Sequence, residues 1–148
     1  MSKDHSLFID GSIPPDLVST QIAKQQTDLR AGAHSIFLGQ VRNDPIDEKR
    51  VHAIEYTAYE EMVLKEYESI KEELFDTYPL RTIEVFHSLG TVPAGEVSLF
   101  VIVTAEHRKE AINACRDAVN FIKKQFPIWG RELLGDEGYQ WKENNFDE

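Results

Sequence analysis

This sequence of 148 residues contains little sulfur and no long apolar run. Its one cysteine, Cys115, excludes an internal disulfide framework. No apolar stretch approaches the roughly 18 to 20 residues that a membrane-spanning helix needs. The first residues also lead into no apolar signal-peptide core. We therefore expect a soluble, cytoplasmic protein that has no membrane among its partners.

Motifs that mark nucleotide and zinc sites are also absent. The chain contains no GxGxxG, GxxxxGK[ST], CxxC or HExxH pattern, which are the patterns that bind dinucleotides, phosphates or zinc. The histidines are scattered along the sequence, at His5, His34, His52, His87 and His107. We assign no metal and no cofactor, and we interpret His87, on a predicted strand, as a structural histidine.

Positive charge is scarce as well, because 26 Asp and Glu face 16 Lys and Arg, a net charge of -10. Nonspecific binding of nucleic acid or of an anionic membrane needs a positive face, so this balance argues against both. Any anionic ligand must meet a local basic cluster instead. The acidic runs at residues 60–76 and 143–148 need no function beyond a solvated helix face and a frayed end.

Apolar periodicity and turn residues divide the chain into nine segments. A length of 148 residues fits one domain, residues 1–148, with frayed ends at 1–11 and 143–148. The predicted helices cover about residues 12–30, 60–78 and 108–125, and the predicted strands cover 33–41, 51–59, 81–88, 96–105, 129–134 and 139–141. The order α-β-β-α-β-β-α-β-β favours an α+β fold with a largely antiparallel sheet covered by helices.

Two predicted helices carry an apolar stripe that we assign to the core. Residues recur at helical spacing in both, at Val63, Tyr67, Ile70 and Leu74, and at Ala111, Cys115, Ala118 and Ile122. Cys115 belongs to the second stripe, so we interpret it as a packed side chain and not as a nucleophile.

The stretch KKQFPIWGRE, residues 123–132, places lysines on the last turn of a helix that Pro127 ends. Lysines there also complement the helix dipole, which is the simpler interpretation for any single one. Beside other cations and partly desolvated, however, Lys123 would have a lowered pKa and could transfer protons. Lys124 lies about 100° around the helix and is expected to face solvent.

Further basic residues stand at element ends. Arg42 follows a predicted strand, where scaffolds present binding groups, although an ordinary surface arginine is the default interpretation. His107 and Arg108 open a helix whose free amides attract anions, so they form a candidate grip for phosphate or carboxylate. Polar side chains that face water at a helix start remain the alternative for this pair.

Taken together, these motifs resemble the large, catalytic subunit family of molybdopterin synthase. The resemblance covers about residues 31–142 and rests on the order of several elements. These are GxVRN at residues 39–43, YxAYEEM at 56–62, HxxG at 87–90, the HR pair at 107–108 and KxxxPIW at 123–129. The ordered combination is far more specific than any one motif.

The resemblance implies an activity and its partners. Such subunits take sulfur from the C-terminal thiocarboxylate of a small ubiquitin-like sulfur carrier that ends in Gly-Gly. They place it on cyclic pyranopterin monophosphate, giving the dithiolene of molybdopterin in molybdenum cofactor biosynthesis. The working assembly implied is a heterotetramer, in which a homodimer carries one small partner at each end.

The resemblance also implies residue roles. Arg42, His107 and Arg108 match positions that line the anionic pterin pocket, and Phe37 would help to shape that pocket. Lys123 matches a catalytic and substrate-binding lysine near the partner's tail. A cation there can steer the thiocarboxylate and stabilise oxyanions.

The sequence departs from the family pattern at several positions. Gly130 stands where the family commonly has a second catalytic lysine, and Arg131 follows it. Arginine stays protonated and is no substitute base, but Arg131 could still supply positive charge, so we predict it as a second catalytic residue. Ser88 replaces a common arginine, and Lys142 is the only basic residue beyond Trp141.

Three hypotheses remain open at this point. The first is an active sulfur-transfer enzyme that relies on Lys123, with Arg131 covering in part for the absent lysine. The second is a catalytically impaired relative that docks a Gly-Gly tail as a scaffold. The third is an enzyme of unrelated chemistry that binds a small anion.

Overall fold

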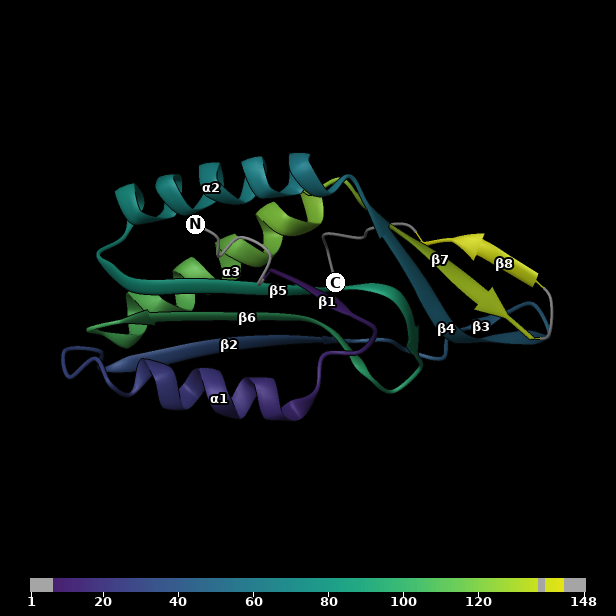
Figure 1. Cartoon of the computed structure of the whole chain (residues 1–148), viewed down its shortest axis with the longest axis horizontal. Coiled ribbons are helices and arrows are strands. Elements are labelled where there is room, and N and C mark those ends of the chain that lie inside the picture. The colour runs from purple at the N-terminus through teal and green to yellow at the C-terminus, as the bar shows by residue number, and fades with distance from the viewer. Residues whose placement is uncertain (1–6, 136–137, 143–148) are drawn as a thin grey trace.

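The computed structural model describes residues 7–135 and 138–142, which form three helices and eight strands (Figure 1). The helices are α1 (Pro15–Gln25), α2 (Glu60–Thr77) and α3 (Arg108–Gln125). The strands are β1 (Phe8–Asp10), β2 (Ala33–Gln40), β3 (Pro45–Ile46), β4 (Lys49–Ala58), β5 (Leu80–Pro93), β6 (Val97–Ala105), β7 (Ile128–Leu134) and β8 (Gly138–Trp141).

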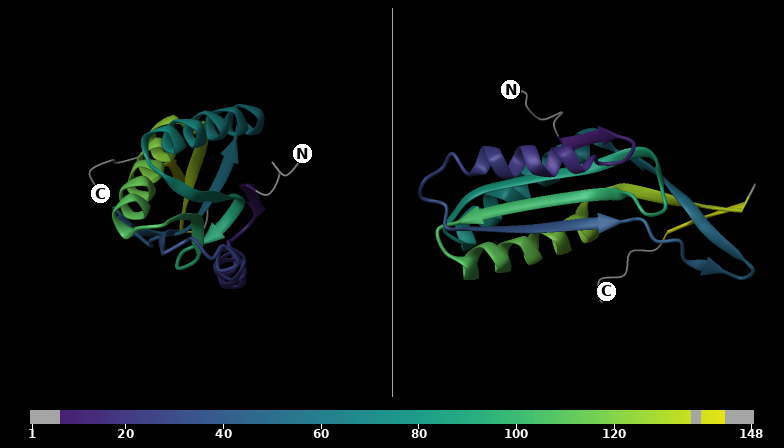
Figure 2. Two further views of the ribbon diagram at one scale, coloured as in Figure 1. Left: turned by 90° about the vertical axis from the view of Figure 1, so that its left-hand side faces the viewer. Right: turned by 90° about the horizontal axis from the view of Figure 1, so that it is seen from below.

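The strands form one sheet in the order β2-β6-β5-β4-β7-β8, with β3 paired to β4 and β1 paired to β5. Every pairing is antiparallel except that of β1 with β5. Helices α2 and α3 cover one face of the main part of the sheet, and α1 covers the other (Figures 1 and 2). The predicted α+β class with a largely antiparallel sheet is confirmed.

Strand β5 belongs to both parts of this sheet. Its first half pairs with β6 as far as His87, and its second half pairs with β4 from Gly90 to Pro93. Gly90, the residue at which the pairing with β4 begins, has a φ of 83°, a left-handed conformation that glycine adopts without steric cost. The strand therefore leaves the main sheet and continues into an extension made of β3, β4, β7 and β8, at the right of Figure 1.

The main hydrophobic core lies between α2, α3 and the sheet. The predicted stripes of both helices are buried there together with β5 and β6 side chains. A second cluster, which includes Ile13, Phe86 and Phe100, lies under α1 on the opposite face. Cys115 is 4% exposed within the main core, and burial raises the pKa of its thiol. The packing role predicted for Cys115 is therefore confirmed.

The first helix is shorter than predicted, because α1 ends at Gln25 and not near Arg30. The Asp28 carboxylate accepts a hydrogen bond from the Arg30 backbone N–H and pairs with the Arg81 guanidinium. These contacts stabilise a turn that competes with further helix. The expected fraying through residue 11 also differs from the structure, since β1 pairs in parallel with residues 87–89 and Leu7 is buried.

Other boundaries agree closely with the sequence. The predicted strands at 129–134 and 139–141 pair with each other as β7 and β8, and α3 covers residues 108–125 as predicted. The sequence missed β1 and β3 and ended β5 too early. Residues 1–6 and 143–148, predicted to be frayed, lie outside the described residues, and the assignment of residues 1–148 to one domain stays a prediction.

Among the described residues, no helix is both long enough and apolar enough to cross a membrane.

Two leucines provide a matched test of the core. Leu74 is 1% exposed in the α2 stripe, whereas Leu29 is 94% exposed after α1. We expect Leu74→Ala to lower the free energy of unfolding by about 2 to 5 kcal/mol, because it removes buried contacts and leaves a cavity. Leu29→Ala should change it by less than about 0.5 kcal/mol. Urea unfolding followed by circular dichroism measures both, and equal effects would contradict this core assignment.

Candidate functional site

A pocket of about 260 Å³ lies where the main sheet meets the extension. Side chains from the end of α3 and from β4, β5, β6, β7 and β8 line it, together with Lys142. The lining residues are Tyr56, His87, Ser98, Leu99, Ile122, Lys123, Lys124, Phe126, Ile128, Trp129, Gly130, Trp141 and Lys142. Among the described residues of this lining, the charged side chains are lysines, so the pocket suits an anion in a protein whose net charge is -10.

Lys123 lies on the last turn of α3 and is half-buried in the pocket wall. The helix ends at Gln125, because Phe126 is extended with a ψ of 126° and Pro127 follows. Phe126 is 6% exposed in the main core and anchors this corner. Lys124 is exposed as predicted, but it also borders the pocket. Both lysines are therefore presented by a fixed helix end.

His87 forms part of the pocket wall, although the sequence indicated only a structural histidine. Its Nδ1 donates a hydrogen bond to the Ser88 carbonyl over 2.8 Å, and the Tyr56 ring contacts it edge-on at 5.0 Å between centroids. Burial lowers the pKa of His87 to about 4, and the nearby positive charge of Lys123 lowers it further. The imidazole is therefore neutral near pH 7 and leaves positive charge to the lysines.

Tyr56 lines the pocket and lies opposite Gly130 in the pairing of β4 with β7. Its hydroxyl shares a 3.1 Å hydrogen bond with Ser98 Oγ, and burial raises the pKa of the phenol. A Cβ atom on Gly130 would lie 3.0 Å from Ile54 Cγ2 and 3.3 Å from Tyr56 Cε1, closer than ordinary van der Waals contact. A side chain at position 130 would therefore require the Ile54 and Tyr56 side chains to shift by a few tenths of an ångström.

The Arg131 side chain points away from the pocket. Successive residues of a strand project from opposite faces of the sheet, so Arg131 and Gly130 lie on opposite faces. Its guanidinium pairs with Glu55 and lies 4.8 Å above the centre of the Tyr139 ring. Arg131 does not line the pocket. This geometry favours a structural role, and the predicted catalytic role of Arg131 stays a prediction.

Arg42 and Phe37 come from the edge strand β2. Arg42 stands two residues beyond the end of the strand, is exposed, and pairs with Asp44 at 3.3 Å. It lies at the same end of the sheet as the pocket, because Val41 pairs with the residues just before β6. Phe37 is half-buried and packs against the main core. Neither residue lines the pocket within one chain.

His107 and Arg108 begin α3, at the opposite end of the helix from Lys123. Fifteen residues at 1.5 Å each separate Arg108 from Lys123 by about 22 Å along the helix axis. His107 is the N-cap residue and borders a separate hollow, of about 190 Å³, beside Glu110. Within one chain, the structure therefore does not bring His107 and Arg108 together with Lys123.

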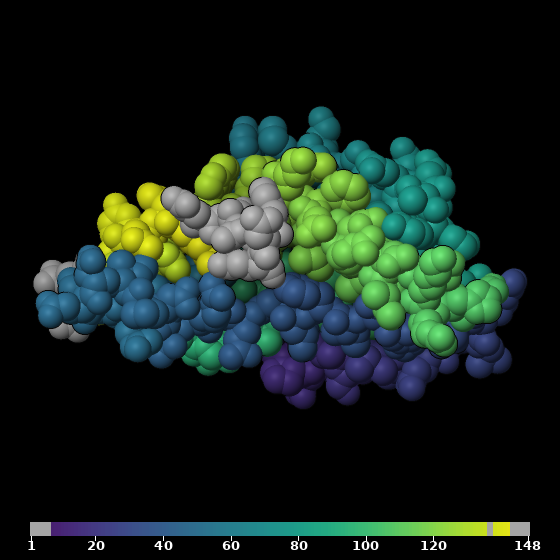
Figure 3. All heavy atoms as spheres, turned by 180° about the vertical axis from the view of Figure 1, so that it is seen from behind, coloured from purple at the N-terminus to yellow at the C-terminus, as the bar shows by residue number. Residues whose placement is uncertain are grey.

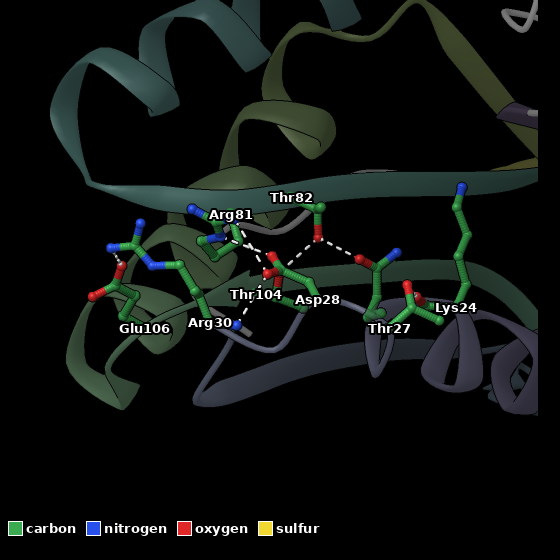
Figure 4. Close-up of polar contacts among 9 residues, drawn as sticks. Lys24, Thr27, Asp28, Arg30, Arg81, Thr82, Thr104 and Glu106 are labelled. Carbon is green, nitrogen blue, oxygen red and sulfur yellow. Dashed lines mark hydrogen bonds and ion pairs between the residues drawn. The ribbon is translucent and has the colours of Figure 1, made fainter.

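Ion pairs hold this second corner in place (Figure 4). The Arg81 guanidinium contacts both carboxylate oxygens of Asp28, and Arg30 pairs with Glu106 at 2.6 Å. Gly32 passes so close that a Cβ on it would lie 2.1 Å from the Glu106 carbonyl oxygen. The close approach of Gly32 and the ion pair of Arg30 with Glu106 thus hold in place the segment that precedes His107.

Sequence reasoning missed several pocket residues, namely Tyr56, Ser98, Trp141 and Lys142. Tyr56 was visible as part of the YxAYEEM motif, without an assigned role. The other three become neighbours only through strand pairing, which no local pattern reveals. Figure 3 shows the face on which the green α3 and the yellow β7 and β8 lie near one another. Among the described residues, no group of histidine, cysteine and acidic side chains is placed to hold a metal ion.

Known proteins resemble the chain in both sequence and structure. The family model described as "MoaE protein" matches residues 14–125. A molybdopterin synthase catalytic subunit of Pyrococcus abyssi is 40% identical over 114 residues, which are 77% of this chain and 76% of that protein. A protein of the same name from Drosophila willistoni is 42% identical over 79% of this chain, but the match spans only 32% of the fly protein.

Solved structures of a molybdopterin synthase and of a molybdopterin-converting factor share the fold of this chain. A molybdopterin synthase structure from Staphylococcus aureus superposes with a TM-score of 0.82 at 25% identity, covering 96% of this chain and 98% of the other. A complex of subunits 1 and 2 of a molybdopterin-converting factor from Helicobacter pylori gives a TM-score of 0.77 at 21% identity, covering 90% and 87%. The second likeness shows the fold alone.

The neutral state of His87 predicts a pH dependence of stability. Its pKa is about 4 in the folded protein against an ordinary value of 6.5, so the unfolded chain takes up the proton first as the pH falls. The stabilisation from His87 is fully present above about pH 6.5 and is lost as the pH falls toward about 4. We expect His87→Gln to flatten the decline of the unfolding free energy between about pH 7 and about pH 4.5.

Urea unfolding at a series of pH values measures this decline. The exposed His52 provides the matched control, because His52→Gln removes an imidazole without removing a buried one. An unchanged slope in His87→Gln would show that His87 titrates normally in the folded state.

Proposed function

The chain belongs to the MoaE protein family, and on that premise we propose that it transfers sulfur from the C-terminal thiocarboxylate of a small partner to cyclic pyranopterin monophosphate. Its curated relatives are molybdopterin synthase catalytic subunits, so the chain is an enzyme subunit of molybdenum cofactor biosynthesis. The observation that carries the proposed chemistry is the lysine-lined pocket at the end of α3. A cytoplasmic location stays a prediction from the sequence.

Lys123 is the residue to which we assign the central chemistry. Its ammonium group can attract the thiocarboxylate and stabilise the oxyanion that forms when the acyl carbon is attacked. In its neutral form it can accept or return a proton as C–O bonds are replaced by C–S bonds. The neutral His87 next to it adds no competing positive charge. Apolar neighbours such as Ile122 and Phe126 limit access of water to this end of the pocket.

The partner proposed for this pocket is a small ubiquitin-like protein that ends in Gly-Gly. A glycine tail is suited to a narrow site, because glycine has no side chain and tolerates unusual backbone angles. Trp129 and Trp141 border the pocket, and their rings offer flat apolar surfaces for such a tail. The Helicobacter structure is described as a complex of two subunits, which supports a small partner subunit here.

We further propose that two copies of the chain complete one substrate site. His107 and Arg108 lie about 22 Å along α3 from Lys123, too far for one small substrate to contact both ends within one chain. In a symmetric dimer, the basic start of α3 in one copy can approach the pocket of the other. Arg42 would then contact the pterin phosphate, and Phe37 would shape the site, as part of the same shared surface. The expected assembly is a homodimer within a heterotetramer.

One observation favours a second candidate, a docking relative without turnover. Gly130 leaves its position without a side chain under Tyr56, and Arg131 is held by Glu55 outside the pocket. If turnover requires the second catalytic lysine that the family commonly has at position 130, Lys123 would not suffice, and the protein would bind a Gly-Gly tail without reaction. Membership of the family removes the third hypothesis, an unrelated anion-binding enzyme.

The proposed role of Lys123 predicts a large loss of turnover. In a single-turnover assay with a thiocarboxylated small partner and cyclic pyranopterin monophosphate, we expect Lys123→Ala to lower the rate by at least about a hundredfold, since a proton-transfer group is removed. Lys65→Ala, on the exposed side of α2, serves as the matched control and should keep the native rate. Native turnover in Lys123→Ala would remove the central residue of this mechanism.

A shared site predicts that inactive variants complement each other. Arg108→Ala and Lys123→Ala should each be inactive alone, whereas a mixed dimer keeps one intact site. After subunit exchange at equal concentrations, we expect about a quarter of the native turnover, because half of the dimers are mixed and each has one working site of two. Turnover that stays at the level of the separate variants would instead place each site within one chain.

A further inference from the structure

Lys142 is a pocket residue whose position the strand pairing explains. Its backbone N–H donates to the Gly130 carbonyl over 2.8 Å, and the preceding pair in the register is Arg131 with Trp141. Lys142 therefore continues the β7–β8 ladder by one step, directly opposite Gly130. Residues directly opposite each other in an antiparallel pair project from the same face. The Lys142 side chain thus leaves the sheet on the face that Gly130 presents.

Three strands share one row of positions at this level. Tyr56 on β4 is paired with Gly130 on β7, and Gly130 faces Lys142 after β8. The Tyr56 ring lies 3.3 Å from where a Cβ atom at position 130 would stand, and its hydroxyl shares a hydrogen bond with Ser98. Because Gly130 has no side chain, the side chains in this row are the Tyr56 ring and Lys142, with an empty position between them. Lys142 is then the first position beyond the ring that can carry a charged side chain into the pocket.

The electrostatic setting favours an anion at this point. Lys123 and Lys124 enter the pocket from α3, and Lys142 enters from the sheet extension. No carboxylate belongs to the lining among the described residues. The nearest acidic residue on the same face of β7, Glu132, is 6% exposed and accepts a hydrogen bond from Gln140. Lysines from two separate parts of the chain thus border one cavity, and an anion bound between them would be attracted by both.

We propose that Lys142 is an anion-binding residue of this pocket. It contacts an oxyanion together with Lys123 and provides, from the position just after β8, the positive charge that Gly130 on β7 cannot provide. This inference rests on the proposed function and adds a residue to it. The oxyanion can be the terminal carboxylate or thiocarboxylate of the partner's tail or the phosphate of the pterin, because both are compact anions that an ammonium group binds. The two sources are separated by the experiment.

The pocket contains its own reporter for binding. The chain has two tryptophans, and both Trp129 and Trp141 border the cavity. Intrinsic tryptophan fluorescence can therefore follow binding without turnover. The probes are a peptide that copies a Gly-Gly tail with a free carboxylate, the same peptide with a C-terminal amide, and inorganic phosphate. The carboxylate peptide cannot transfer sulfur, so it measures binding alone.

Lys142→Ala should weaken binding of the carboxylate peptide by about 10-fold or more, as expected for loss of a charge-assisted hydrogen bond. Binding of the amidated peptide should change by less than about 2-fold, since it lacks the charge that Lys142 contacts. Lys142→Arg should restore most of the affinity, because charge and not proton transfer is required. A loss confined to inorganic phosphate would assign Lys142 to the phosphate of the pterin.

Lys49→Ala provides the matched control. Lys49 lies at the start of β4 on the same sheet extension and is exposed, but it does not line the pocket. We expect this variant to bind all three probes as the native chain does. Circular dichroism on each variant checks that the fold is kept, and Lys142→Arg retains a long basic side chain if Lys142→Ala is destabilised.

The outcomes separate this inference from the proposed function. Native affinity of Lys142→Ala for both the carboxylate peptide and phosphate would overturn the role of Lys142, even if the native chain turns over substrate. Loss of anion binding in Lys142→Ala, together with a native chain that forms no product, would support Lys142 and contradict the proposed enzyme. Loss of both binding and single-turnover product in Lys142→Ala, with recovery in Lys142→Arg, would support the two together.

Discussion

The pocket depends on a single strand that belongs to two parts of the sheet. Strand β5 pairs with β6 up to His87 and with β4 from Gly90 onward, and the left-handed glycine at the change of partner lets the chain redirect. The extension that carries β7 and β8 is thereby set beside the end of α3. Without this change of partner, Lys123 and Lys142 would have no common cavity. The pocket is accordingly formed by several elements that meet where the main sheet joins the extension, and no single helix or strand forms it alone.

At the junction of the main sheet and the extension, the pocket lining carries positive charge, while the protein as a whole is negatively charged. The chain as a whole is strongly acidic, so it does not attract anions over its general surface. The part of the pocket lining that the structure describes contains no acidic residue, and the buried His87 stays neutral because burial lowers its pKa. Positive charge among these described lining residues therefore comes from lysines, whose ammonium groups lie at the ends of flexible side chains. A local anion site in an acidic protein is selective because nonspecific attraction is weak.

The sequence predicted local structure well and long-range proximity poorly. Helix α3 and its buried stripe followed from periodicity and from Pro127, and the family followed from ordered motifs. The turn at Asp28 was missed because the ion pair that stabilises it joins residues 53 positions apart. Lys142 was noticed only as a lone basic residue, because its neighbour Gly130 is reached by strand pairing. Arg131 was predicted as catalytic because it follows the position of the family's second lysine; alternation along β7 directs its side chain toward Glu55, and its catalytic role stays a prediction.

The burial of Cys115 has a consequence for a protein that handles activated sulfur. The thioester intermediates that form when a thiocarboxylate passes on its sulfur can be attacked by accessible thiolates, which would divert the acyl group by thiol–thioester exchange. The only thiol of this chain is closed within the core, and its pKa is raised, so the reactive thiolate is scarce. The surface is therefore inert toward thiol exchange. Sulfur can be passed on by such a protein without ever being held by one of its own side chains.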